Sequence, residues 1–133
     1  MISIKAPFEV ALMRTAGKLL AEVVEVVREN LAVGVTTLEL DRICEEEIRK
    51  RGAVPAFKGY QVGKEVFPAS LCASINEQVV HGSPNDMPLV EGDLVSLDFG
   101  LSFGNYYADR AFSQVRGEAR PEVAHLLDVT RNS

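Results

Sequence analysis

Residues 96–113, with the sequence SLDFGLSFGNYYADRAFS, constrain the fold of this chain more than any other segment. Apolar residues alternate with polar or small ones on both sides of a central FGN, which is the pattern of a two-stranded antiparallel hairpin. A turn centred on Phe103 and Gly104 places Asp98 directly opposite Asp109. Like charges that face each other across a sheet at ~5 Å destabilise it, so this pair requires an explanation.

The alternation also separates two faces of the predicted hairpin. Asp98 and Asp109 share one face, whereas the face expected to meet the core carries Val95, Leu97, Phe99, Leu101, Tyr106, Ala108 and Phe112. The residues alone leave two explanations open. The carboxylates either lie on a solvated face, where screening reduces the cost to a few tenths of a kcal/mol, or share a divalent cation, which prefers carboxylate oxygens.

Two amphipathic helices are expected before the hairpin. Apolar residues recur at helical spacing from about residue 8 to 32, and Pro7 and Glu9 suit the start of that helix. Thr36 and Glu39 have the spacing of a capping box, which predicts a second helix at about 37–51.

The remaining segments predict strands at about 69–76, 93–101 and 106–116, and the start of a further helix at about 121–133. No linker divides the chain, so residues 1–133 are expected to form a single domain. The order of elements predicts an α+β fold in which two long helices pack on one face of an antiparallel sheet.

Composition narrows the class of protein. The chain of 133 residues is 47% hydrophobic and 25% charged, which is typical of a globular domain, and its net charge of −5 argues against a nucleic-acid-binding surface. No signal peptide or membrane-spanning run is evident. Cys44 and Cys72 have no CxxC spacing, so two reduced thiols and a cytoplasmic location are expected.

Several motifs in a fixed order resemble one enzyme family. NEQVVHG at 76–82 is followed by SLDFG and YADRAFS, and PAFKGY at 55–60, CASIN at 72–76 and VEGDLVSLDFG at 90–100 add to the similarity. Together these motifs, from about residue 4 to 132, resemble the type I methionine aminopeptidases. The resemblance implies half of a pita-bread fold.

The resemblance implies a metal site in the hairpin. Asp98 and Asp109 match the first two metal ligands of that family, the first binding one metal ion and the second bridging two. Two divalent ions of Co, Mn, Fe, Ni or Zn are therefore expected as cofactors. Such a pair activates water and stabilises the charge that develops when a peptide bond is hydrolysed.

The resemblance also implies how substrate binds. His81 matches a catalytic histidine that contacts the scissile amide, and Tyr60, Phe67 and Cys72 fall where the family lines its methionine pocket. The implied substrate is the N-terminus of a peptide or nascent protein, from which methionine is removed.

Other ligands of the family, a histidine and two glutamates, together with a second substrate-contacting histidine, belong to a second half of similar size that this sequence does not contain. HLLDVTRNS at 125–133 resembles FEVALMRTAG at 8–17, so the chain is expected to be the N-terminal half. A homodimer, or a complementing C-terminal half, would then complete a dimetal site.

Alternative readings stay open. The chain could be an inactive pita-bread half that acts as a binding or metal-binding module, or a relative of the proline-specific peptidases and creatinases. Cys72 could be a redox or nucleophilic site, although pocket lining or packing fits it better. Glu122 and His125 have the E-x-x-H spacing of di-iron bundles, but a surface role fits them better.

Overall fold

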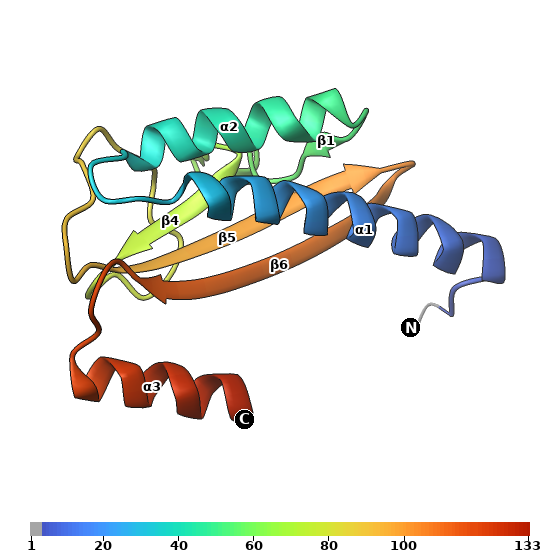
Figure 1. Ribbon diagram of the computed structural model, residues 1–133. Coiled ribbons are helices and arrows are strands. Elements are labelled where there is room, and N and C mark those ends of the chain that lie inside the picture. Colours follow the sequence, from blue (N-terminus) through green and yellow to red (C-terminus); the bar gives the residue numbers. More distant parts are fainter. Residues whose placement is uncertain (1–3) are drawn as a thin grey trace.

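A long central strand organises the sheet of the computed structural model, which describes residues 4–133 (Figure 1). This strand, β5, spans Leu94–Phe103 and pairs along its whole length with β6, Tyr106–Val115. Its other edge pairs with β4, Leu71–Ile75, and then with β1, Val54–Pro55. All of these pairings are antiparallel.

Two helices cover one face of this sheet. α1 spans Pro7–Asn30 and contacts β5 and β6, whereas α2 spans Thr37–Lys50 and contacts β1 and β4. The third helix, α3, spans Pro121–Asn132 and lies apart from both, beyond β6 (Figure 1). The predicted α+β arrangement, with two long helices on one face of an antiparallel sheet, is therefore confirmed.

The two-residue strands β2 and β3, Gln61–Val62 and Glu65–Val66, form a separate small hairpin. The sequence indicated only a loop there and at β1. Elsewhere the ends of the expected helices and strands lie within two residues of the observed ends. No helix within residues 4–133 is long and apolar enough to cross a membrane.

Side-chain carboxylates cap both long helices. The Ala6 N–H donates to Glu9 Oε2 at 2.7 Å and the Tyr106 hydroxyl to Glu9 Oε1 at 2.7 Å, which ties α1 to the start of β6. At α2, the Thr36 N–H donates to Glu39 Oε2 at 2.8 Å, completing the predicted capping box. These backbone donors lower the pKa of both glutamates.

The register of the hairpin differs from the expected one. Asp98 lies opposite Ala111, and Asp109 lies opposite Gly100. The prediction that Asp98 and Asp109 face each other directly is therefore wrong. The shift is two residues, and because side chains alternate with a period of two, both aspartates still share one face of the sheet.

The turn explains the shift. Phe103 pairs with Tyr106, so the turn residues are Gly104 and Asn105, with φ angles of 57° and 66°. A two-residue hairpin turn of this type needs positive φ at both positions, which glycine and asparagine tolerate and phenylalanine does not. A turn at Phe103 and Gly104 would have strained Phe103.

The core lies between the two helices and the sheet. β5 contributes alternate side chains that are fully buried, and α1 and α2 close over them with their own apolar faces. The largest fully buried side chains are Phe99, Leu20, Leu40, Ile48, Leu71, Leu97 and Leu101. This packing holds β5 in place and leaves the opposite face of the sheet for other chemistry.

Candidate metal and substrate site

A hollow of about 1240 Å³ lies along the sheet and is lined by residues of β4, β5, β6, the loop after β4 and α3. Its polar lining includes Cys72, Ser74, His81, Asp98 and Arg131. Asp98 and Cys72 belong to the face that the long helices leave uncovered, since their neighbours Leu71, Ala73, Leu97 and Phe99 point into the core.

Asp98 has an unusual environment for a carboxylate. It lies opposite Cys72 in the β4–β5 ladder, and its Oδ1 is buried without a hydrogen-bond partner among the described residues. Burial raises the pKa of Asp98, and the charge of Asp109 raises it further, whereas the Phe99 N–H and His81 act in the opposite direction. Buried polar atoms normally have a partner, so the Oδ1 of Asp98 is an acceptor that an additional donor or a cation would satisfy.

Cys72 shares this environment. Burial, followed by the charges of Asp98 and Asp109, raises the pKa of its thiol to about 11. The thiol is therefore protonated at neutral pH, which argues against a nucleophilic or redox role, because that chemistry needs the thiolate. Cys44, the other free and buried thiol, lies in the core, and burial raises its pKa as well.

His81 reaches the hollow from the loop after β4. Its φ of 59° is in the left-handed region, which is uncommon for any residue other than glycine. His81 acts to lower the pKa of Asp98, whereas Asp109 acts to raise it, and His81 and Asp98 line the same hollow. The loop therefore brings a histidine to the hollow that Asp98 lines, over a chain separation of more than fifteen residues.

Residues 11–133 match the sequence pattern of metallopeptidase family M24. The chain belongs to this family. It is 44% identical over its full length to a methionine aminopeptidase of Clostridium perfringens and 39% identical to methionine aminopeptidase 1 of Bacillus subtilis, and it covers 52% of each. The chain thus spans about half the length of the curated relatives it matches.

Solved structures give the same fold for this M24 chain. A methionine aminopeptidase from Thermotoga maritima superposes with a TM-score of 0.91 and 36% identity, covering 99% of this chain and 52% of that one. A prolidase from Pyrococcus furiosus superposes with a TM-score of 0.83 at 20% identity, which shows a shared fold alone. The pita-bread fold expected from the sequence is confirmed.

Two side chains of this M24 chain carry donor atoms of the kind that divalent cations prefer. Asp98 and Asp109 supply the hard oxygen atoms that divalent ions prefer, and the unpartnered Oδ1 of Asp98 is the one whose burial a cation would compensate. No group of three or more His, Cys, Asp or Glu side chains within residues 4–133 is arranged to hold a metal ion. The two carboxylates alone therefore offer only part of the donor set that a divalent cation prefers.

Tyr60 and Phe67 meet each other rather than the hollow. They flank the β2–β3 hairpin, where the Phe67 N–H donates to the Tyr60 carbonyl oxygen at 2.8 Å. Tyr60 is 65% exposed, and both residues lie outside the lining of the hollow described above. Their role in binding a methionine side chain stays a prediction, as do the roles of His81, Cys72, Asp98 and Asp109.

The sequence did not predict two residues that lie near these side chains. Ser74 lines the hollow and is almost fully buried, and its alternation with Cys72 in the segment ASLCASIN could have indicated this. Phe57 covers Gly100, the partner of Asp109, so closely that a Cβ at Gly100 would lie 2.5 Å from the Phe57 ring. Nothing in the sequence pattern places Phe57 there.

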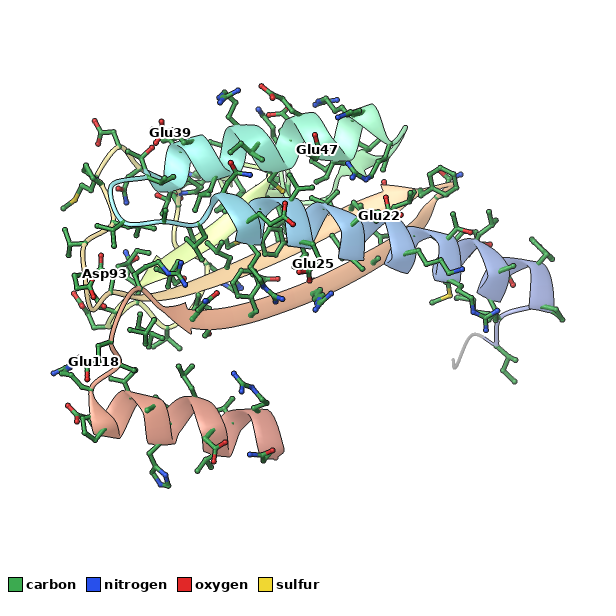
Figure 2. The ribbon with its side chains drawn as sticks, in the orientation of Figure 1. Glu22, Glu25, Glu39, Glu47, Asp93 and Glu118 are labelled. Atoms are coloured by element: carbon green, nitrogen blue, oxygen red, sulfur yellow. The ribbon has the colours of Figure 1, made fainter. Side chains whose placement is uncertain are left out.

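The E-x-x-H pair of α3 shows no ligand geometry. Glu122 forms an ion pair with Arg120 at 3.5 Å, and both Glu122 and His125 are exposed. The acidic run at 45–47 forms ion pairs along α2. Glu47 on α2 and Glu22 on α1, both labelled in Figure 2, each form an ion pair with Arg51, which links the two helices. These are structural roles on the helical side of the molecule.

Proposed function

We propose that this chain forms part of the active site of an enzyme that removes methionine from the N-terminus of peptides and nascent proteins in a metal-dependent reaction. The observation that carries the proposal is the buried, unpartnered Oδ1 of Asp98 next to Asp109, Cys72 and His81. Two relatives that the chain resembles are named methionine aminopeptidases, which supports the choice of substrate.

Asp98 and Asp109 would hold divalent cations, drawn from Co, Mn, Fe, Ni or Zn, between β5 and β6. Cations held there supply an activated water and polarise the substrate carbonyl group. The β5–β6 ladder fixes both aspartates on one face of the sheet, and the two carboxylates would thereby position the cations. Negative charges on neighbouring strands of one face, which are costly in a bare sheet, then become useful.

His81 would contact the scissile amide and share in proton movement at that group, since its loop carries it to the rim of the same hollow. Cys72, in its protonated form, would offer a small and weakly polar surface to the methionine side chain. Tyr60 and Phe67, which flank the β2–β3 hairpin outside this hollow, would add aromatic surface to the methionine pocket.

Two carboxylates are fewer donors than a divalent cation requires. We infer that the shell is completed either by a second copy of this chain or by a complementing C-terminal half, so that this chain works as one half-domain of a two-lobed enzyme. Two free, buried thiols suit a reducing compartment, and they support our proposal of a cytoplasmic location.

The test combines cation binding with turnover. Calorimetric titration with Co²⁺ should show binding that Asp98→Asn and Asp109→Asn each abolish, with Asp86→Asn, an exposed loop residue, as the matched control. Release of methionine from Met-Ala-Ser should depend on added Co²⁺ and be lost in His81→Ala. Equal binding of Co²⁺ by the wild type and Asp98→Asn would overturn the proposed metal site.

The alternatives predict other outcomes. Cation binding without release of methionine, in a preparation that sedimentation shows to be monomeric, would favour an inactive metal-binding module. Preferential cleavage of Xaa-Pro peptides would favour a proline-specific peptidase. A concentration-dependent dimer that binds about one pair of cations per two chains would support self-completion of the site.

A further inference from the structure

The loop from Asn76 to His81 begins and ends in a left-handed backbone conformation. Three residues other than glycine have positive φ within residues 4–133: Asn76 at 55°, His81 at 59° and Asn105 at 66°. Asparagine and histidine adopt this conformation more often than most other residues do, but it is still uncommon and persists where surrounding contacts hold it. The question is what holds His81.

The start of the loop is anchored to β5. The Asn76 side chain donates to Asp93 Oδ1 at 2.9 Å and accepts from the Leu94 N–H at 2.9 Å. Asp93 lies just before β5, where Figure 2 labels it. These bonds account for the conformation of Asn76, but they lie five residues before His81 and do not constrain it.

The end of the loop is anchored to the outer edge of β4 through Gly82. The Ala73 N–H donates to the Gly82 carbonyl oxygen at 2.8 Å, and the Gly82 N–H donates to Ser74 Oγ at 3.1 Å. A Cβ at Gly82 would lie 2.2 Å from the Ala73 carbonyl oxygen, so only glycine allows this approach. The peptide that joins His81 to Gly82 is therefore held by Ser74.

Ser74 is suited to this task by its place in the sheet. It lies two residues after Cys72, on the same face as Cys72 and Asp98, and opposite Ser96. Its side chain is almost fully buried, with 3% of the residue exposed. A buried hydroxyl on a rigid strand offers a fixed acceptor, whereas a water molecule at that place would allow the loop to relax.

We propose that Ser74 is a positioning residue: its Oγ fixes the Gly82 N–H, and through it the left-handed backbone of His81, so that this histidine is kept at the rim of the hollow that Asp98 lines. The catalytic consequence rests on the role proposed above for His81. The placement itself does not, because it follows from the bonds of Ser74 and Gly82.

The sequence offers a matched control. Ser70 is also a fully buried serine next to β4, but its Oγ has no hydrogen-bond partner among the described residues. Ser70→Ala and Ser74→Ala thus delete the same atom from similar surroundings, and only the second deletes an acceptor of the loop. Ser74→Thr keeps the hydroxyl and serves as the rescue variant.

The first measurement is by NMR on the full chain. In Ser74→Ala the amide hydrogen exchange of Gly82 should rise about tenfold or more, as expected for the loss of one hydrogen bond, and the one-bond Cα–Hα coupling of His81 should move to the value of negative φ. Ser70→Ala and Ser74→Thr should match the wild type. Unchanged Gly82 exchange and His81 coupling in Ser74→Ala would overturn the proposal, as would equal changes in Ser70→Ala.

Gly82→Ala covers the case in which Ser74→Ala fails to fold. It pushes the loop from β4 while leaving Ser74 in place, so His81 should lose its positive φ although the strand remains. A left-handed His81 in Gly82→Ala would contradict the role of this anchor.

The second measurement is kinetic. With Met-Ala-Ser and Co²⁺, Ser74→Ala should lower kcat about tenfold with little change in KM, because a displaced imidazole affects the reaction more than binding. Equal kcat in Ser74→Ala, despite a displaced His81, would overturn the catalytic consequence. Lack of turnover in the wild type would count against the proposed enzyme, while the NMR results would still decide the role of Ser74.

Discussion

The two faces of the β4–β5–β6 sheet differ in the side chains that β5 contributes to them. Beneath α1 and α2, β5 contributes only apolar side chains, among them Leu97 and Phe99, both fully buried. On the other face the same strand carries Asp98, whose Oδ1 is buried without a partner in the described part of the chain. Alternate residues of one strand therefore serve different purposes: one set stabilises the core, and the other presents a polar group that the fold itself does not satisfy.

The largest effect should come from the core face. Phe99→Ala removes a fully buried ring that stacks on Phe112 with 5.8 Å between centroids, and it should lower the free energy of unfolding by about 3–5 kcal/mol. Urea denaturation measures this, with the exposed Val79→Ala as the control. A loss below about 1 kcal/mol would mean that the helices do not depend on this face of the sheet.

Much of this contrast could be predicted from alternation. A period of two separates Leu97 and Phe99 from Asp98 whatever the exact register, so the faces were predicted correctly although the register was not. The register depended on which residues accept positive φ at the turn. The pattern SFGNY contains one glycine and one asparagine side by side, and giving weight to both would have placed the turn at Gly104 and Asn105.

Other parts of the site could not be predicted from sequence, because they depend on contacts between distant segments. The bond from the Gly82 N–H to Ser74 is set by how the loop returns to β4, and no local rule gives that path. The approach of Phe57 to Gly100 depends on the pairing of β1 with β5, a pairing of only two residues. Short strands carry too little pattern to be recognised in a sequence.

A smaller effect on stability should come from Asp41, a half-buried residue of α2 whose carboxylate has hydrogen-bond partners. Its Oδ1 accepts from the Ser70 N–H at 2.7 Å and the Leu71 N–H at 3.0 Å, at the start of β4. Asp41→Ala leaves both donors without this partner and should cost about 1–3 kcal/mol in unfolding free energy. Asp41→Asn keeps an acceptor and should be much milder.

The pH dependence separates these two variants further. Burial raises the pKa of Asp41 above its usual value, so the folded chain binds this proton more tightly than the unfolded chain. The stability that the protonated group contributes is fully present below the unfolded pKa and is lost as pH rises through the folded pKa. The free energy of unfolding of Asp41→Asn, relative to that of the wild type, should therefore be highest at neutral pH and lowest in acid. The opposite trend in urea titrations would contradict this explanation.

The smallest effect should have the opposite sign and should come from the polar face. Asp98→Asn removes a negative charge that burial and Asp109 both oppose, so in EDTA it should stabilise the fold by about 0.2–1 kcal/mol, the size of a cross-strand charge pair. Asp86→Asn, in an exposed loop, should leave stability unchanged. Added Co²⁺ should reverse the ranking, because a cation that binds only the folded wild type raises its stability.

If Asp98→Asn instead destabilises the chain in EDTA, Asp98 has a hydrogen-bonding role in the fold, and the contrast between the two faces is weaker than the geometry indicates. Stabilisation in EDTA together with loss of the Co²⁺ effect would show that this face gives up stability to keep a cation ligand.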